Sequence, residues 1–227
     1  MTSTAFFDVA GTLVSGNPWT YVFEHPRVSK RRVQLAYVPV TFWWWMKKLH
    51  VVDDTRFRHH WLWSVVSVFK GWPREEMRQV FADSVAASRA AGEFISETAE
   101  RIAWHKAQGH RVVLVTGLFD LFADEYVRAV GADAAIGSPL AFDSKGVSTG
   151  KLAGPTIGGP TKLDAMRGYL EREKLNPDLH AHYAYADSYS DVPMLSSVGN
   201  PYAVHPEPEL AEFAKAHGWP ILGNLTQ

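Results

Sequence analysis

Two short apolar runs, far apart in the chain, each end in a polar residue close to a glycine. The first, Ala5 to Val9, carries Asp8 into the turn Ala10-Gly11-Thr12, and the second, Arg111 to Thr116, ends at Gly117. A continuous apolar run that stops at a glycine turn is typical of a strand buried on both faces. Such strands occur in parallel sheets covered by helices, so the pattern predicts an α/β fold.

The chain alternates between helical and extended segments after Gly117. Apolar spacing predicts helices over Phe119–Val130, Thr161–Lys174 (with Thr161 as N-cap), Val192–Val198 and Glu209–His217, and short strands over Ala134–Ser138, Ala181–Ala186, Tyr202–Val204 and Pro220–Leu222. The stretch from Leu140 to Leu152 predicts a hairpin with Lys145-Gly146 at its turn. Strands that alternate with helices require crossover connections, which favour a doubly wound, mainly parallel sheet.

Residues 17 to 91 have a different character. They show helical apolar spacing and many aromatic side chains, and a further helix is expected from Phe94 to Gln108. We therefore expect an α/β core formed by residues 1–16 and 92–227, with residues 17–91 inserted as a helical cap. The tryptophans at 43, 44, 45, 61 and 63 are expected to pack the cap against itself and the core. An apolar substrate pocket or a contact with a membrane surface is the alternative for them.

The composition excludes several classes of protein. The chain has 227 residues, 46% of them hydrophobic, and 23 basic against 24 acidic residues, so it can bury a core and has no basic field for nucleic acid. It has no cysteine, which excludes disulfides and thiolate chemistry and fits a cytoplasmic protein. The first residues show no signal-peptide pattern, and the most apolar stretch, Tyr37 to Met46, is too short to cross a bilayer.

Polar side chains of complementary chemistry follow three of the predicted strands. They are Asp8, Thr116 with Gly117, and Asp187 with Asp191. Because ligands bind at the carboxyl ends of parallel strands, we expect these groups to meet in one crevice. Converging carboxylates repel unless a cation neutralises them, and hard oxygen ligands suit Mg²⁺. Lys162 can bring a further positive charge, and this set of groups indicates phosphoryl chemistry.

These residues form four motifs through which the chain resembles the haloacid dehalogenase superfamily, in its phosphoserine-phosphatase-like branch, subfamily IB. The motifs are Asp8 to Thr12, Val113 to Gly117, Thr161-Lys162 and Ala186 to Leu195. Each motif alone is a weak signal, whereas all four in this order are a strong one. The resemblance covers nearly the whole core and only loosely the insertion, and it implies a Rossmann-like core with a helical cap.

The resemblance implies a role for each motif residue. Asp8 would attack phosphorus and become an aspartyl-phosphate, and Mg²⁺ would be held by Asp8, the backbone carbonyl of residue 10 and Asp187. Asp191 would support the metal shell or orient Lys162. Thr116, the Gly117 amide and Lys162 would bind the phosphate oxygens. The expected substrate is a small phosphorylated metabolite.

Ala10 departs from the family pattern. Family phosphatases carry at this position an aspartate that protonates the leaving group and then activates water, and a methyl group can do neither. Metal binding should survive, because that ligand is a backbone carbonyl, whereas acid-base help of about 10²- to 10⁴-fold is lost. Three explanations remain open: a deliberate inactivation that traps a complex, an acid supplied by the insertion, or a different reaction.

The different reaction would resemble that of phosphonoacetaldehyde hydrolases, which carry alanine at this position and use an insertion lysine as a Schiff base. Lysines are available in the insertion at positions 30, 47, 48 and 70. A non-catalytic protein that binds phosphate, or one that lies on a membrane surface, is a second alternative. We expect a magnesium-dependent phosphatase that works through Asp8 and is slowed by Ala10.

Several other polar residues have a structural interpretation beside the functional one. Arg56 and Arg58 could contact an anionic substrate from the cap, or could lie on a solvated helix face. Asp191 could simply cap the following helix. The histidines at 59, 60, 180 and 182 have no third ligand at metal-binding spacing, so packing or surface roles are favoured for them.

Overall fold

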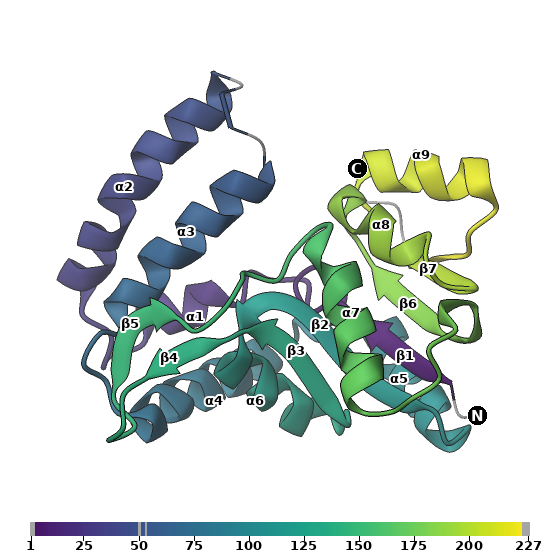
Figure 1. Ribbon diagram of the computed structural model, residues 1–227, viewed down its shortest axis with the longest axis horizontal. Coiled ribbons are helices and arrows are strands. Elements are labelled where there is room, and N and C mark those ends of the chain that lie inside the picture. Colours follow the sequence, from purple (N-terminus) through teal and green to yellow (C-terminus); the bar gives the residue numbers. More distant parts are fainter. Residues whose placement is uncertain (1–2, 50, 53, 224–227) are drawn as a thin grey trace.

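The computed structural model describes residues 3–49, 51–52 and 54–223. Its main sheet has the order β3-β2-β1-β6-β7-β8, and each neighbouring pair is parallel. The strands are β1 (Thr4–Phe7), β2 (Arg111–Phe119), β3 (Ala134–Ser138), β6 (Tyr183–Ala186), β7 (Asn200–Val204) and β8 (Ile221–Leu222). The chain winds outward from β1 in one direction and then in the other, as predicted for a doubly wound α/β fold (Figure 1).

Alternate side chains of β1 enter two separate apolar clusters. Phe7 lies in a cluster with Tyr126 and Phe122 of α6 (Asp120–Val130) and with α5 (Ser96–Ala107), whereas Phe6 lies in a cluster with Met166 of α7 (Thr161–Arg172). Helices α8 (Val192–Leu195) and α9 (Pro208–His217) cover the same face as α7. Because successive strand residues point to opposite faces, this continuous apolar run buries both of them.

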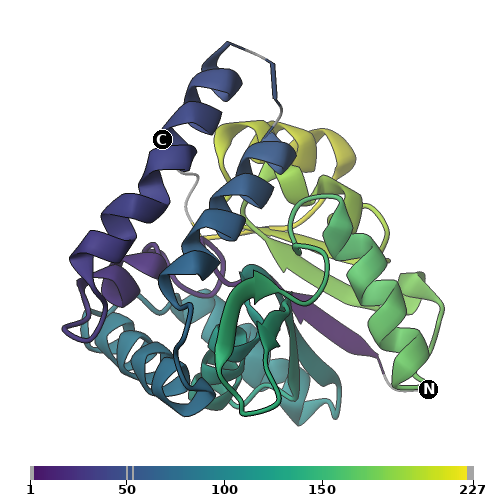
Figure 2. The ribbon, with the colours of Figure 1, turned by 60° about the vertical axis from the view of Figure 1, so that its left-hand side comes forward.

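The insertion forms four helices, α1 (Trp19–Glu24), α2 (Lys30–Lys48), α3 (Asp54–Val68) and α4 (Arg74–Ala90). Helices α1 and α4 join the core, since Trp19 packs edge-on against Phe119 at 4.9 Å and Phe81 stacks on Phe122 at 4.7 Å. Helices α2 and α3 instead project from the body as a helical hairpin (Figures 1 and 2). The domain division at residues 17 and 91 remains a prediction.

A small antiparallel hairpin of β4 (Leu140–Phe142) and β5 (Ser148–Leu152) closes the base of the projecting helices. The Gly71 amide donates to the Ser148 carbonyl at 2.8 Å, and the Ser148 amide donates to the Trp72 carbonyl at 2.8 Å. These bonds tie the end of α3 to the core. The hairpin predicted over Leu140–Leu152 is confirmed.

The structure corrects three details of the predicted elements. Strand β2 continues to Phe119, so Thr116 lies inside the strand rather than at its end. Thr161 is not an N-cap: Pro160 holds that position, and the Thr161 hydroxyl accepts from the Gly158 amide at 2.9 Å. Strand β6 begins only at Tyr183, because a 3₁₀ turn occupies Leu179–Ala181.

The tryptophans of the cap divide between packed and exposed positions. Trp43 stacks on His60 at 3.5 Å and Trp61 packs edge-on against Trp19 at 5.3 Å, as predicted. The packing prediction is wrong for Trp44, Trp45 and Trp63, which are all exposed. Within the described part of the chain, no helix combines the length and the apolar character that crossing a membrane requires.

Candidate active site

A cavity of about 360 Å³ opens at the carboxyl end of the parallel sheet. Its wall includes Asp8, which follows β1, Thr116 and Gly117 of β2, and Asp187, which follows β6. Strands β2 and β6 lie on opposite sides of β1, where the winding direction of the sheet reverses. Open α/β sheets bind their ligands at this point. The strand-end residues predicted to meet therefore lie around one cavity.

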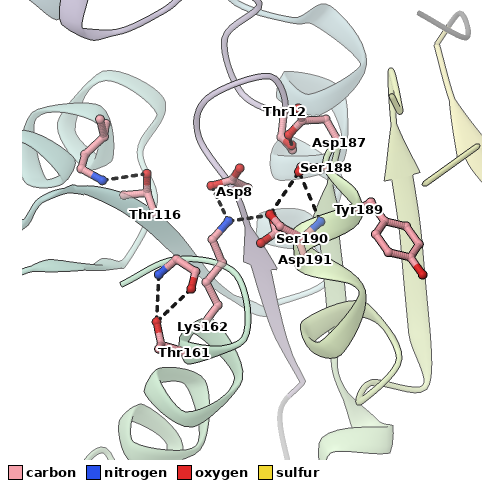
Figure 3. A network of polar contacts seen from close by, with 12 residues as sticks. Asp8, Thr12, Thr116, Thr161, Lys162, Asp187, Ser188, Tyr189, Ser190 and Asp191 are labelled. Carbon is pink, nitrogen blue, oxygen red and sulfur yellow. Dashed lines mark hydrogen bonds and ion pairs between the residues drawn. The ribbon is translucent and has the colours of Figure 1, made fainter. Parts of the chain in front are cut away.

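Lys162 lies between two carboxylates at the floor of this cavity (Figure 3). Its ammonium is 2.8 Å from Asp8 Oδ1 and 2.7 Å from Asp191 Oδ2, and all three side chains are buried. Burial alone would lower the pKa of Lys162, but the charges of Asp191 and Asp8 outweigh it and raise that pKa. The lysine therefore brings a positive charge to the site.

Asp187 completes the acidic side of the cavity. The Thr12 hydroxyl donates to Asp187 Oδ1 at 2.9 Å, and the carboxylate fits against Gly11, where a Cβ would lie 2.0 Å from Oδ2. Gly11 also has φ +83°, a conformation that favours glycine. Burial, and then the neighbouring charge of Asp8, raises the pKa of Asp187 to about 7. Asp8 and Asp187 therefore act on each other electrostatically.

Thr116 and Gly117 form the opposite wall of the cavity. The Thr116 side chain is buried, and its hydroxyl oxygen accepts from the Leu118 amide at 3.3 Å, which fixes the side chain rotamer. Both residues line the cavity together with Asp8 and Lys162. The site thus offers several hydrogen-bond donors around the Asp8 carboxylate: the Thr116 hydroxyl, the Gly117 backbone and the Lys162 ammonium. Such a set of donors suits an anion with several oxygens.

The donor set fits a magnesium ion. Three carboxylates, Asp8, Asp187 and Asp191, line the cavity with one buried ammonium, so one divalent cation would offset the excess of negative charge among these four groups. Asp191 Oδ1 is buried and has no hydrogen-bond partner, which leaves a hard oxygen to be satisfied. Among the described residues no three His, Asp or Glu side chains form a complete chelating group, so Mg²⁺ would also need the Ala10 carbonyl or water.

Ala10 is exposed on the cavity wall. The residues of the insertion that line the described cavity are Asn17, Pro18, Trp19, Arg58, Trp61 and Leu62, and none of them is acidic. The only described acidic wall residue beyond the three aspartates is Glu207, which accepts from the Ser188 hydroxyl at 3.2 Å. An acid supplied by the insertion is therefore not found on the described wall.

The two arginines proposed for substrate contact lie in different places. Arg58 of α3 lines the cavity, whereas Arg56 is not among the described lining residues. The four lysines considered for a Schiff base, Lys30, Lys47, Lys48 and Lys70, are likewise absent from the described wall. The structure therefore brings one cap cation, Arg58, to the site.

The structure distinguishes the structural from the functional interpretation for Asp191 and His182. Asp191 makes no side-chain cap bond at α8 and pairs with Lys162 instead. His182 is buried, with Nδ1 accepting from the Thr4 amide at 3.0 Å, so it has the packing role expected. Sequence reasoning gave no role to Thr12 or Glu207. Thr12 lies within the first motif and could have been found there, whereas nothing local marks Glu207.

Comparisons with known proteins agree with this geometry. A family model described as haloacid dehalogenase-like hydrolase matches residues 5–196. Phosphoserine phosphatase SerB1 of Mycobacterium tuberculosis is 32% identical over 232 residues, which cover 97% of this chain and 70% of the relative. The inhibition of morphological differentiation protein of Streptomyces azureus is 33% identical over 153 residues, and the match covers 67% of this chain and 54% of that protein.

Two solved structures share the fold. A protein of unknown function from Bordetella pertussis Tohama I has a TM-score of 0.78 at 20% identity, and the match covers 100% of both chains. A substrate-bound phosphoserine phosphatase complex has a TM-score of 0.60 at 19% identity and covers 99% of this chain and 94% of that one. With the matching family model and the SerB1 relative, the four motifs and the parallel sheet lead to one conclusion: the chain belongs to the haloacid dehalogenase-like hydrolase family, as a phosphoserine-phosphatase-like phosphoric monoester hydrolase.

Proposed function

We propose that this chain is a magnesium-dependent phosphatase that hydrolyses a small phosphorylated metabolite through an aspartyl-phosphate on Asp8. The observation that carries the proposal is the pairing of Lys162 with both Asp8 and Asp191 beside Thr116 and Asp187 in one cavity. A volume of about 360 Å³ suits a small molecule. A cytoplasmic location remains a prediction from the sequence.

In the first step an Asp8 carboxylate oxygen attacks phosphorus, and the bond from phosphorus to the leaving oxygen breaks. Lys162, the Thr116 hydroxyl and the Gly117 amide would hold the other phosphoryl oxygens, so the charge that develops in the transition state meets fixed donors. Asp191 would keep the Lys162 ammonium in place. Mg²⁺, held by Asp8, Asp187 and the Ala10 carbonyl, would act as a Lewis acid and offset the repulsion between carboxylate and phosphate.

Ala10 sets the speed of both chemical steps. The leaving oxygen needs a proton and the attacking water must lose one, and the methyl group of Ala10 can neither give nor take it. An ester with a good leaving group needs little protonation of the leaving oxygen. The first step would therefore still proceed with an aryl phosphate, although more slowly than in a phosphatase that has the aspartate. Breakdown of phospho-Asp8 needs an activated water whatever the leaving group was. The covalent intermediate should therefore accumulate.

The carbon-phosphorus alternative receives less support. It requires an insertion lysine at the reacting carbon, and the candidate lysines do not line the described cavity. Lys162, the lysine that does line it, is engaged by two carboxylates that raise its pKa, which disfavours the neutral amine that a Schiff base needs. Phosphate-ester hydrolysis is therefore the better match to the site.

Steady-state hydrolysis of p-nitrophenyl phosphate with Mg²⁺ tests the proposal. Ala10→Asp should raise turnover by roughly two to four powers of ten, a lowering of the barrier by about 3 to 5 kcal/mol. The exposed Ala153→Asp adds the same charge away from the cavity and should leave turnover unchanged. Intact-mass measurement should find a phosphoryl group on the parent chain and none on Asp8→Asn.

Two results would contradict the proposal. Rapid turnover by the parent that Ala10→Asp slows down would show that another group supplies the proton. Phosphate binding without turnover in the parent and in Ala10→Asp alike would identify a phosphate-binding protein rather than an enzyme.

A further inference from the structure

The outer face of α2, continued by its C-cap residue Leu49, carries a stripe of large apolar side chains that remain exposed in the described structure. The ring contacts of Phe42 and Trp45 are with their neighbours Trp43 and Trp44 on the same helix. Leu35, Val38, Phe42, Trp45 and Leu49 are 61%, 64%, 56%, 54% and 62% exposed. Their spacing alternates between three and four residues, so they occupy about 80° of the helix circumference. A contiguous row of exposed large apolar side chains on a folded protein is typical of an interaction surface. We refer to these five residues as the α2 stripe.

The stripe is not needed for packing within the chain. The opposite face of α2, with Ala36 and Val40 buried and Trp43 stacked on His60, already forms the contact with α3. Helix α3 in turn lies between α2 and the body, and its residues Arg58 and Trp61 line the active-site cavity. Figures 1 and 2 both show α2 on the outside of the molecule. The stripe is therefore presented outward from the cap.

Positive charge lies at both ends of the stripe. From His25 to Val52 the sequence contains six Lys or Arg residues, at positions 27, 30, 31, 32, 47 and 48, and no acidic residue, in a chain whose net charge is -1. Lys48 lies over the rings of Trp44 and Trp45, at 5.3 and 5.4 Å from their centroids. Lys48 thus forms one continuous surface with these two rings, whereas Lys47 lies over the Phe57 ring of α3, 5.5 Å from its centroid. The positive charge of this segment complements an anionic partner.

Pairing with a second copy of α2 is disfavoured by the same charges. Basic residues lie at both ends of the helix, Lys30 and Arg31 at the start and Lys47 and Lys48 at the end. A parallel or an antiparallel pair would therefore bring like charges together at each end. Trp, Phe and Leu beside Lys and Arg are the residues that favour the boundary between lipid headgroups and acyl chains.

We propose that the α2 stripe and its flanking lysines and arginines bind the surface of an anionic lipid bilayer. The stripe would enter the interfacial layer, and the basic side chains would contact the lipid headgroups. The helix would lie along the surface, since charged residues bound its apolar stripe at both ends. This proposal concerns the cap's outer face and does not depend on the reaction at Asp8.

Sedimentation of the whole chain with vesicles tests the proposal. The parent should bind vesicles of phosphatidylcholine mixed with phosphatidylglycerol, bind phosphatidylcholine alone weakly, and lose affinity as salt is raised. The double variant Phe42→Gln/Trp45→Gln should bind at least roughly tenfold more weakly, and so should Lys47→Gln/Lys48→Gln. The control is Trp104→Gln, which removes an exposed tryptophan from α5 of the core and should bind like the parent.

Circular dichroism of both double variants should match the parent, and the lysine pair gives a second test if the aromatic pair does not fold. Equal vesicle binding by the parent and a folded Phe42→Gln/Trp45→Gln variant would overturn the proposal. So would a parent that does not bind anionic vesicles better than neutral ones. Light scattering that finds a dimer in the parent and a monomer in the aromatic variant would instead assign the stripe to a second copy of the chain.

Discussion

The ammonium of Lys162 lies 2.8 Å from the carboxylate of Asp8, and both side chains are buried at the end of the central strand β1. The lysine comes from α7, more than a hundred residues further along the chain, so the helix and the strand are joined electrostatically at the site where chemistry is proposed. Removing either partner of this ion pair should therefore change the stability of the fold.

Lys162→Met should destabilise the fold strongly. The variant leaves Asp8 and Asp191 buried without their cation, and breaking a buried ion pair in this way costs about 3 to 5 kcal/mol. Urea unfolding at neutral pH without added metal measures the loss. Lys145→Met, at the exposed turn of the β4–β5 hairpin, should change the free energy of unfolding by less than about 0.5 kcal/mol. Similar losses in the two variants would contradict a stabilising role for the buried pair.

Mg²⁺ should raise the unfolding temperature of the parent, because a ligand that binds only the folded state stabilises it by mass action. Asp187→Asn removes one proposed ligand, so the shift should shrink. Asp143→Asn is the matched control at an exposed position and should keep the full shift. Thermal unfolding with and without Mg²⁺ measures all three proteins. An undiminished shift in Asp187→Asn would remove Asp187 from the metal site.

Gly11→Ala should be far more damaging than Gly71→Ala. Both glycines have nearly the same backbone conformation, φ +83° and φ +82°, so both substitutions carry a left-handed penalty of about 1 to 2 kcal/mol. A Cβ at Gly11 would lie 2.0 Å from Asp187 Oδ2, whereas one at Gly71 would meet nothing within 4 Å. The difference between their unfolding free energies therefore isolates the clash with Asp187. Equal losses would mean that Asp187 moves away freely.

His105 should contribute a loss of stability as the pH is lowered from about 6.5 to about 4, whereas Asp187, whose pKa is raised to about 7, contributes in the opposite direction. The imidazole of His105 is buried, and burial, followed by the charge of His110, lowers its pKa to about 4. Between the two values the unfolded chain takes up a proton that the folded chain does not, so acid favours unfolding. The contribution is at most about 3 kcal/mol.

His105→Gln should remove this contribution, so the free energy of unfolding of the variant should fall less, or rise more, than that of the parent as the pH is lowered. In the parent, His105 Nε2 lies 2.9 Å from the Tyr185 hydroxyl. The glutamine side chain of the variant can still form a hydrogen bond with this hydroxyl, but glutamine does not titrate. Urea unfolding of both proteins at a series of pH values between 7 and 4 gives the comparison. If the free energies of unfolding of the two proteins change with pH in parallel, the acid sensitivity must come from groups other than His105.

Arg58→Gln should alter the ranking of phosphorylated substrates, since Arg58 contributes the cap's charge to the cavity wall. Arg56→Gln, on the same helix but outside the described wall, should preserve the parent ranking. A panel of phosphate monoesters that differ in charge next to the phosphate would reveal the change in kcat/KM. Unchanged ranking in both variants would place substrate selection elsewhere in the cap.

The sequence alone determined the parallel core and predicted which motif residues meet at one edge of the sheet. Buried parallel strands are continuous apolar runs, and residues near their carboxyl ends meet at one edge whatever the connections between them. Asp8, Asp187 and Thr116, which lies inside the longer β2, could therefore be brought together from local patterns. The order of the four motifs then fixed the family. These are features that a short segment carries by itself.

Only the tertiary structure decided which faces of the cap helices point inward. Arg56 and Arg58 lie two residues apart on one helix, yet only Arg58 lines the described cavity, because the rotation of α3 is set by its packing against α2 and the core. The same packing half-buries Trp43 against His60 and leaves Trp45 exposed. In helices that are apolar around most of their circumference, periodicity does not choose the buried side, and contacts between distant segments must do so.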